Sequence, residues 1–164
     1  MIESFDLLFF SMRGRRCAVD VASVRQVIAT PPVTPVPLVP ALIRGAISFH
    51  GSPLAVLDLG VELLPGSLEA SGLNADPAAR SAHDYVMIIE GNLPDDGIFA
   101  RAALSVEKVM RVVPVPANLF RPAVGPPAFV SATVVDSEGP ALLIDVPLAL
   151  AAALNTTRQG KHAA

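Results

Sequence analysis

The sequence contains few of the residues that most often carry chemistry or crosslink a small protein. It has 1 cysteine, 3 histidines and no tryptophan, and charged residues make up only 16% of it. A single cysteine, Cys17, excludes an intrachain disulfide, and its apolar neighbours predict a buried, inert thiol. His50, His83 and His162 lie far apart without the spacing of metal ligands. We therefore expect no metal site, no cofactor and no catalytic thiol.

The chain also lacks a strong charge of either sign. Its net charge is -3, and its only basic cluster, Arg13, Arg15 and Arg16, surrounds Gly14 as in a solvated hairpin turn. The N-terminal stretch MIESFDLLFF has no basic leader, and the apolar run 146–154 is about half the length of a membrane span. We expect a cytoplasmic protein that neither binds nucleic acid nor inserts into a membrane.

Apolar residues are what the sequence has in abundance. They make up 52% of the chain, although aromatic residues contribute only 5%. Val, Leu, Ile and Ala must therefore fill the interior, which favours β-structure. With so little polar surface available, we expect a partner to cover part of the apolar exterior. Self-association is one way to cover it.

The two halves of the chain repeat each other. AVDVASVRQVI at 18–28 matches ALSVEKVMRVV at 103–113 with a shift of 85, and LAVLDL at 54–59 matches ALLIDV at 141–146 with a shift of 87. A proline-rich passage separates the two blocks in each half. Features that recur in one order at nearly one offset predict a duplicated β-unit. Valines three apart in the first block fit either a helical turn or a bulged strand.

Short strands and turns follow one another in each half. The first strand of each is expected at 5–11 and at 83–91, and hairpins are expected to turn at 50–53 and 136–140. Such spacing is typical of small barrels or sandwiches. We expect one domain over 1–164 with a disordered tail at 155–164. Its expected lobes are 5–64, with 141–154 packing on it, and 83–154, joined by a loop at 65–82.

Asp58 and Asp145 recur at the ends of the matching apolar strands. Each precedes a short helical pattern, at 60–64 or 146–154, so its carboxylate is placed to cap the helix. Pro147 in the first turn agrees with that placement. Two lobes that each supply one aspartate would also suit a hydrolase, but neither acid has the Ser or Thr neighbour of an aspartic-protease loop. We interpret both as helix caps.

The block VTPVPLVPALIRGAISFHGSPLAVLDL at 33–59 resembles the signature of CheW-like domains, the coupling proteins of bacterial chemosensory arrays. The resemblance extends over about residues 5–154. The matching elements are Val36-Pro37, Pro40, Ile43-Arg44-Gly45, Ser48-Phe49-His50-Gly51 and Ala55-Val56-Leu57-Asp58-Leu59. Departures mark a divergent member: His50 replaces the family's arginine in the turn, Ser48 an asparagine, Gln26 a glutamate and Leu104 an aspartate.

The resemblance implies a mainly β fold of two SH3-like five-stranded β-barrel lobes with a shared hydrophobic core and short helices. It also implies a non-catalytic adaptor in chemotaxis signal transduction. The implied partners are the cytoplasmic tip of a methyl-accepting chemoreceptor and the regulatory domain of a CheA-type histidine kinase of a two-component system. A stand-alone β-barrel module that binds a peptide or a small ligand is the alternative function, and a two-aspartate hydrolase is a remote one.

Matching the family motif position by position gives two sets of candidate contact residues. The receptor-binding candidates are Val24, Gln26, His50, Val86, Met87 and Val109. The kinase-binding candidates are Ile43, Arg44 and Gly45. For each valine, core packing is the competing interpretation, and an exposed turn residue without function is the competing interpretation of His50.

Overall fold

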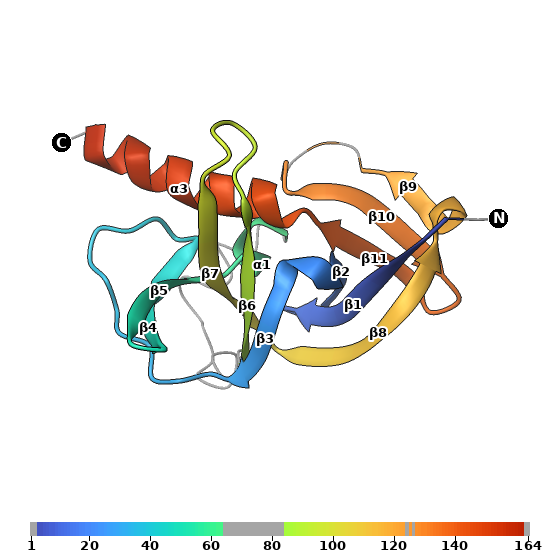
Figure 1. The fold of residues 1–164 in the computed structure, drawn as a ribbon, viewed down its shortest axis with the longest axis horizontal. Coiled ribbons are helices and arrows are strands. Elements are labelled where there is room, and N and C mark those ends of the chain that lie inside the picture. Colours follow the sequence, from blue (N-terminus) through green and yellow to red (C-terminus); the bar gives the residue numbers. More distant parts are fainter. Residues whose placement is uncertain (1–2, 64–83, 124, 126, 163–164) are drawn as a thin grey trace.

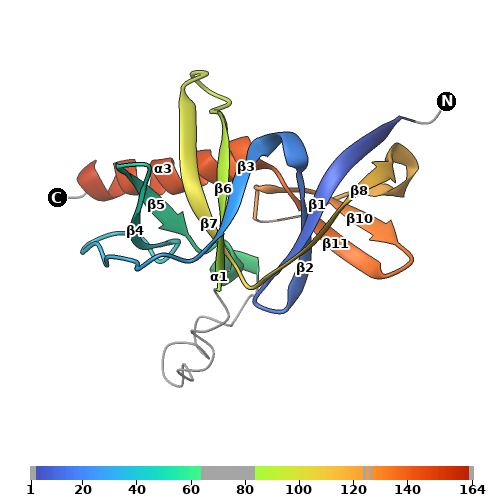
Figure 2. The same cartoon turned by 60° about the horizontal axis from the view of Figure 1, so that its bottom comes forward.

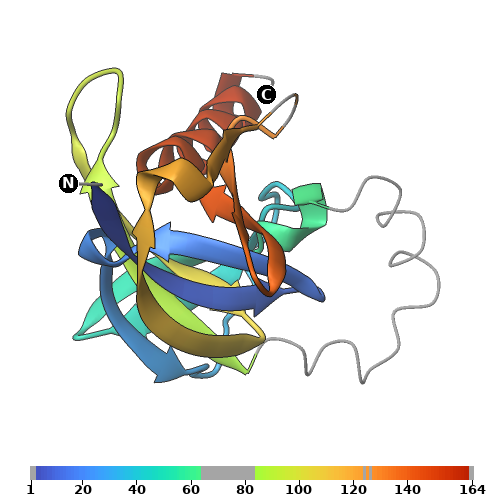
Figure 3. The same ribbon diagram turned by 90° about the vertical axis from the view of Figure 1, so that its right-hand side faces the viewer.

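The strands form two sheets that lie side by side as two lobes (Figure 1). The structure is a computed structural model, which describes residues 3–63, 84–123, 125 and 127–162. We call lobe 1 the sheet with strand order β8-β1-β2-β11-β10-β9 and lobe 2 the sheet with order β3-β6-β7-β5-β4. The strands of lobe 1 curve strongly rather than lying flat (Figure 3). The mainly β, two-lobed fold expected from the sequence is confirmed, with the short β9 as a sixth strand in lobe 1.

The elements follow the order expected for a repeated unit. The first half contains β1 (Ser4–Met12), β2 (Arg15–Asp20), the 3-10 turn η1 (Val21–Ser23), β3 (Val24–Ala29), β4 (Ile43–Phe49), β5 (Ser52–Leu57) and α1 (Gly60–Leu63). The second half contains β6 (Tyr85–Asn92), β7 (Phe99–Val106), β8 (Lys108–Pro116), the 3-10 turn η3 (Ala117–Leu119), β9 (Phe120–Pro122), β10 (Val130–Asp136), β11 (Gly139–Ile144) and α3 (Val146–His162). The expected loop at 65–82 lies outside the described residues.

The two halves exchange their first hairpins. Lobe 1 combines β1 and β2 with β8 to β11, and lobe 2 combines β6 and β7 with β3 to β5. The sheets therefore divide the chain differently from the stretches 5–64 and 83–154. Each exchanged hairpin is joined to the other half by one antiparallel pair, β1 with β8 or β6 with β3, and by one parallel pair. The parallel pairs place Ala18 opposite Leu143 and Ala103 opposite Val56. Because these four residues are equivalent under the shifts seen in the sequence, the strand register confirms the duplication.

The valine-rich block adopts a different conformation in each half. In the first half the Asp20 carboxylate accepts a hydrogen bond of 2.9 Å from the Ala22 N–H, which holds the chain in η1. Ser105 is the equivalent residue in the second half, and it is fully buried in β7. There the chain passes at Glu107 directly into β8. The helical turn and the strand therefore both occur, because Asp20 of the first half is replaced by the buried Ser105 in the second.

One hydrophobic core joins the lobes. Side chains of β1 alternate, so that Leu8, Phe10 and Met12 enter the shared core while Leu7 and Phe9 enter a smaller cluster of lobe 1. The shared core also contains Leu57, Met87, Leu104, Ile144 and Leu150. It thus draws on both sheets and on α3, as expected.

Helix α3 begins where the sequence predicts it. The Asp145 Oδ1 accepts a hydrogen bond of 3.0 Å from the Leu148 N–H, so Asp145 caps the helix as expected. The helix continues to His162, whereas we expected it to end near 154 and be followed by a disordered tail. No proline follows Pro147, and no glycine occurs before Gly160, so nothing in the sequence stops the helix earlier.

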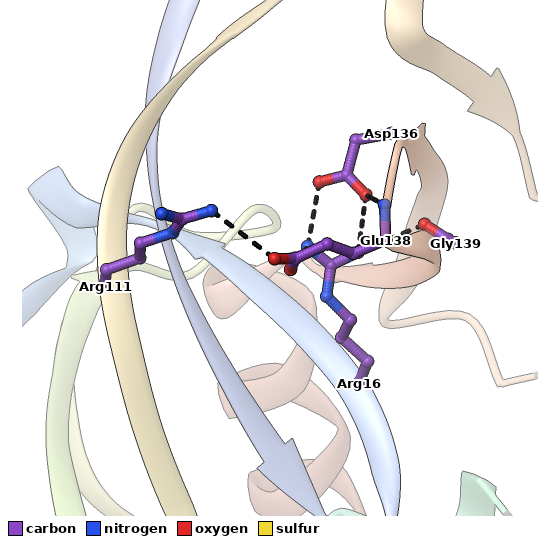
Figure 4. A network of polar contacts seen from close by, with 5 residues as sticks. All are labelled: Arg16, Arg111, Asp136, Glu138 and Gly139. Carbon is purple, nitrogen blue, oxygen red and sulfur yellow. Dashed lines mark hydrogen bonds and ion pairs between the residues drawn. The ribbon is translucent and has the colours of Figure 1, made fainter.

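An arginine of the first half is paired with the last hairpin (Figure 4). Arg16 makes two hydrogen bonds, of 2.9 and 2.8 Å, to the carboxylate of Asp136, and a third to the Gly139 carbonyl. Its guanidinium also lies 4.5 Å from the ring centroid of Phe9. The Arg16 hydrogen bonds lower the pKa of Asp136. The prediction that Arg13, Arg15 and Arg16 form a solvated turn is therefore partly wrong. Arg16 is paired with Asp136, and Arg13 is paired with Asp58.

The Arg16–Asp136 pair predicts a pH-dependent contribution to stability. Because the folded pKa of Asp136 is lowered, its contribution is fully present above the usual aspartate pKa of about 4 and is lost as the pH falls through the folded value. Asp136→Asn should therefore lower the free energy of unfolding at pH 7 by up to about 1 kcal/mol, as for bidentate surface pairs. Urea denaturation should show this difference shrinking below pH of about 4.

Asp95→Asn is the matched control, because Asp95 is an exposed aspartate in the turn between β6 and β7. It should leave the unfolding free energy nearly unchanged at both pH values. A loss for Asp136→Asn that stayed the same at low pH would contradict the assigned role of the ion pair.

Candidate protein-interaction surfaces

Two of the predicted receptor contacts lie at equivalent positions of β3 and β8. Both strands run past the boundary between the lobes (Figure 2). Val24 and Val109 are half-buried and pack against the shared core. Gln26 is exposed on β3, one residue beyond a bulge. Among the strands that the structure describes, β3 pairs with β6 and β8 pairs with β1, and each is the end strand of its sheet.

Strand β8 also exposes two apolar residues that the sequence analysis missed. Met110 is 40% exposed and Val112 is 51% exposed. The sequence does contain a signal for them, because KVMRVVPVP is apolar on both of the faces that alternate along a strand. One face of β8 packs inward: Val109 against the shared core, and Val113 and Val115 in the smaller cluster of lobe 1. Met110 and Val112 are left exposed to solvent or to a partner.

Two other receptor candidates do not lie at the surface. Val86 and Met87 occupy the centre of β6 and are fully buried, Val86 in a cluster of lobe 2 and Met87 in the shared core. Neither side chain is available to a partner in this conformation. Core packing, the competing interpretation of such apolar residues, describes their place here because β6 lies between β3 and β7 within its sheet.

The kinase candidates lie at the start of β4, beside an apolar groove. The groove encloses about 310 Å³ between β4, β5, β7, α3 and the segment before β4. Its lining includes Val36, Val39, Ile43, Leu54, Ala100 and Leu154. Ile43 contributes its side chain to the groove, whereas the Arg44 guanidinium donates a hydrogen bond of 3.0 Å to the Ser105 hydroxyl.

Gly45 has a steric role. Its φ is +153°, and a Cβ atom there would lie 2.4 Å from the carbonyl oxygen of Thr34. Thr34 and Ala46 exchange two backbone hydrogen bonds, of 2.8 and 2.9 Å, directly beside it. The glycine therefore allows the segment that follows β3 to pair with β4.

His50 forms the tight turn between β4 and β5. His50 and Gly51 both have positive φ, of 49° and 78°, which matches a type I′ hairpin turn. The imidazole is exposed and packs edge-on against Phe49, with ring centroids 4.2 Å apart. Since β4 and β3 are the two outer strands of lobe 2, the fold puts His50 on the hairpin of Ile43 rather than on the strand of Gln26.

The residues considered for chemistry are held in structural contacts. Asp58 is buried and its carboxylate pairs with Arg13 at 2.8 Å, whereas Asp145 caps α3. Two carboxylates with separate partners do not form a dyad that shares a proton. Burial raises the pKa of the Cys17 thiol to about 12, as expected for an inert cysteine.

Within the part of the chain that the structure describes, no group of three or more His, Cys, Asp or Glu could hold a metal ion. In that same part, no helix is long and apolar enough to cross a membrane.

These features define a class: a mainly β protein of two SH3-like lobes with one core between them and apolar residues on its outer strands. A family model of the CheW-like domain matches residues 6–153, and the chain belongs to this family. The predicted resemblance is thereby confirmed, and membership makes the chain a scaffold or adaptor protein of chemotaxis signal transduction.

Comparison with solved structures supports the fold. The scaffolding protein TtCheW from Thermoanaerobacter tengcongensis has a similar structure, with a TM-score of 0.64 and 19% sequence identity. The similarity covers 87% of this chain and 89% of that chain. No curated protein matches the sequence.

The contact at Gly45 predicts a large effect of a small change. Gly45→Ala should lower the free energy of unfolding by about 2 to 3 kcal/mol, because the new methyl group meets the Thr34 backbone. Gly97→Ala is the matched control: Gly97 also has positive φ, of 70°, but nothing lies within 4 Å of the added Cβ. We expect the control to cost about 1 kcal/mol in urea denaturation. Equal losses for the two variants would refute the steric role.

Proposed function

We propose that this protein couples the cytoplasmic tip of a chemoreceptor to the regulatory domain of a CheA-type histidine kinase. It would act by binding alone, without turnover, in the cytoplasm. The observation that carries the proposal is the presence of two separate apolar surfaces on one rigid fold. One is on β8, where Met110 and Val112 are exposed, and the other is the apolar groove beside β4. A chain with two such surfaces is able to hold two partners at once.

The β3 and β8 surface suits a helical partner. An amphipathic helix presents apolar anchors on one side, at spacings of three and four residues. Met110 and Val112 are exposed, and the half-buried Val24 and Val109 lie on the same two strands, so apolar anchors would find apolar surface there. Gln26 adds an exposed amide for a polar contact at the rim. We assign the receptor tip to this surface.

The kinase domain is assigned to the surface beside β4. Ile43 and the apolar groove supply the contact area, and His50 lies at the other end of the same strand. Arg44 and Gly45 contribute through the shape of the surface, because the former is bonded to Ser105 and the latter is covered by Thr34. Val86 and Met87, being buried, support β3 from within the sheet.

The receptor surface is tested by Val112→Asp. A carboxylate there would have to lose its water in the complex, so affinity for a receptor-tip fragment should fall about tenfold or more. Val135→Asp is the matched control, because Val135 is 43% exposed on β10 of the same lobe. Isothermal titration calorimetry should show binding unchanged in the control. Equal affinity of both variants and the wild type for the receptor fragment would contradict this surface.

The kinase surface is tested by His50→Glu. The side chain is exposed in a turn, so the fold should persist, while the new charge beside an uncharged surface weakens binding of a kinase regulatory-domain fragment. His50→Asn is the control, because asparagine also tolerates positive φ and adds no charge. Pull-down of receptor and kinase fragments that is unchanged in His50→Glu would count against the assignment.

A further inference from the structure

The segment between β3 and β4 presents a leucine in an unusual way. Leu38 has a φ of +61°, a region that bulky residues rarely adopt, and its side chain is fully exposed, at 103% of the reference area. It follows Pro37 in a turn at the position where a glycine is normally found. Pro40 stiffens the segment further, and Val36 is 40% exposed. A strained backbone that holds an apolar side chain out into solvent points to a binding role.

The apolar groove lies next to this leucine. Val36 and Val39, on either side of Leu38 in the sequence, both line the groove, so the segment that carries Leu38 borders it. The groove encloses about 310 Å³. A cavity of about 150 Å³ with a similar lining holds a benzene molecule. A leucine side chain therefore fits inside the groove.

The charge pattern of this face favours a partner that is itself uncharged. From Thr30 to Leu57, Arg44 is the only Asp, Glu, Lys or Arg, and its guanidinium is bonded to Ser105. Arg101 is the one charged side chain among the described residues that line the groove, and it pairs with Glu90 at 2.8 Å. A charged partner would lose its water here without gaining an ion pair. A second copy brings the same face, whose two arginines are already bonded within the chain.

We propose that this face pairs with the same face of a second copy, and that Leu38 of each copy enters the apolar groove of the other. Such a contact is a two-fold, self-complementary interface, because each copy supplies one leucine and one groove. It goes beyond the adaptor function proposed above and has a consequence for it. Ile43 and the groove are shared by both contacts, so a paired copy is unable to bind the kinase domain through this face.

The decisive variant is Leu38→Gly, measured by sedimentation velocity on the full chain over a range of concentrations. We expect a reversible monomer–dimer equilibrium for the wild type and a dissociation constant raised about 100-fold or more in the variant, because two buried leucines are lost. Glycine favours positive φ, so the variant should keep or raise the melting temperature. Ile98→Ser is the matched control, since Ile98 is 53% exposed before β7, and it should dimerise like the wild type.

A second variant tests the groove. Leu154 is 40% exposed and lines the groove from α3, so Leu154→Glu should also abolish pairing while Leu38 remains intact. A mixture of Leu38→Gly and Leu154→Glu should associate more strongly than either alone, because one leucine and one groove still match. No recovery in the mixture would overturn the reciprocal arrangement.

Other outcomes refute the second copy as the occupant. A wild type that stays monomeric, or a Leu38→Gly variant that dimerises like the wild type, would overturn the proposal. If the wild type is monomeric and Leu38→Gly loses a kinase fragment instead, the face belongs to the kinase and the adaptor proposal stands. If Leu38→Gly abolishes dimers but Val112→Asp and His50→Glu change no partner binding, the surfaces assigned to the adaptor are wrong and the self-pairing stands.

Discussion

The fold depends on strand pairs between the two halves of the chain, among them the parallel pairs of β2 with β11 and β7 with β5. Each joins a hairpin of one half of the chain to strands of the other half, so neither lobe consists of one continuous stretch. The shared core forms on the same basis, because Phe10 from β1 and Leu104 from β7 meet in it from opposite lobes. The relative position of the lobes is therefore fixed by packing rather than by a linker. An adaptor benefits from that rigidity, since the geometry between its two partners is then set by the fold.

Much of the fold could be predicted from the sequence because it is local or repeated. Alternating apolar residues mark the strands, and the matched blocks identify the duplication. The exchange of hairpins could not be predicted, because β2 has the same apolar pattern whichever half supplies its neighbour. The exchange is seen in the strand register, which pairs Ala18 of the first half with Leu143 of the second. The different paths after Asp20 and Ser105 depend on one side-chain hydrogen bond, which periodicity does not contain.

The interaction surfaces were predicted less completely than the fold. Motif matching located Val24 and Val109 at equivalent edge positions, but it also selected Val86 and Met87, which are buried. A sequence motif includes every residue that an interaction surface requires. Some of these residues contact the partner, and others are buried and support the surface from below. The steric role of Gly45 is of this kind, since it depends on Thr34, a residue of another segment that the sequence gives no reason to place there.

The exchange of hairpins also sets the order in which the protein can be completed during synthesis. All strands of lobe 2 have left the ribosome once Val106 has emerged, whereas β1 and β2 wait for β11, which ends at Ile144. Until then the apolar side chains of the first hairpin have no sheet to join on that side. Exposed apolar surface and unpaired strand edges of this kind make a nascent chain prone to aggregate.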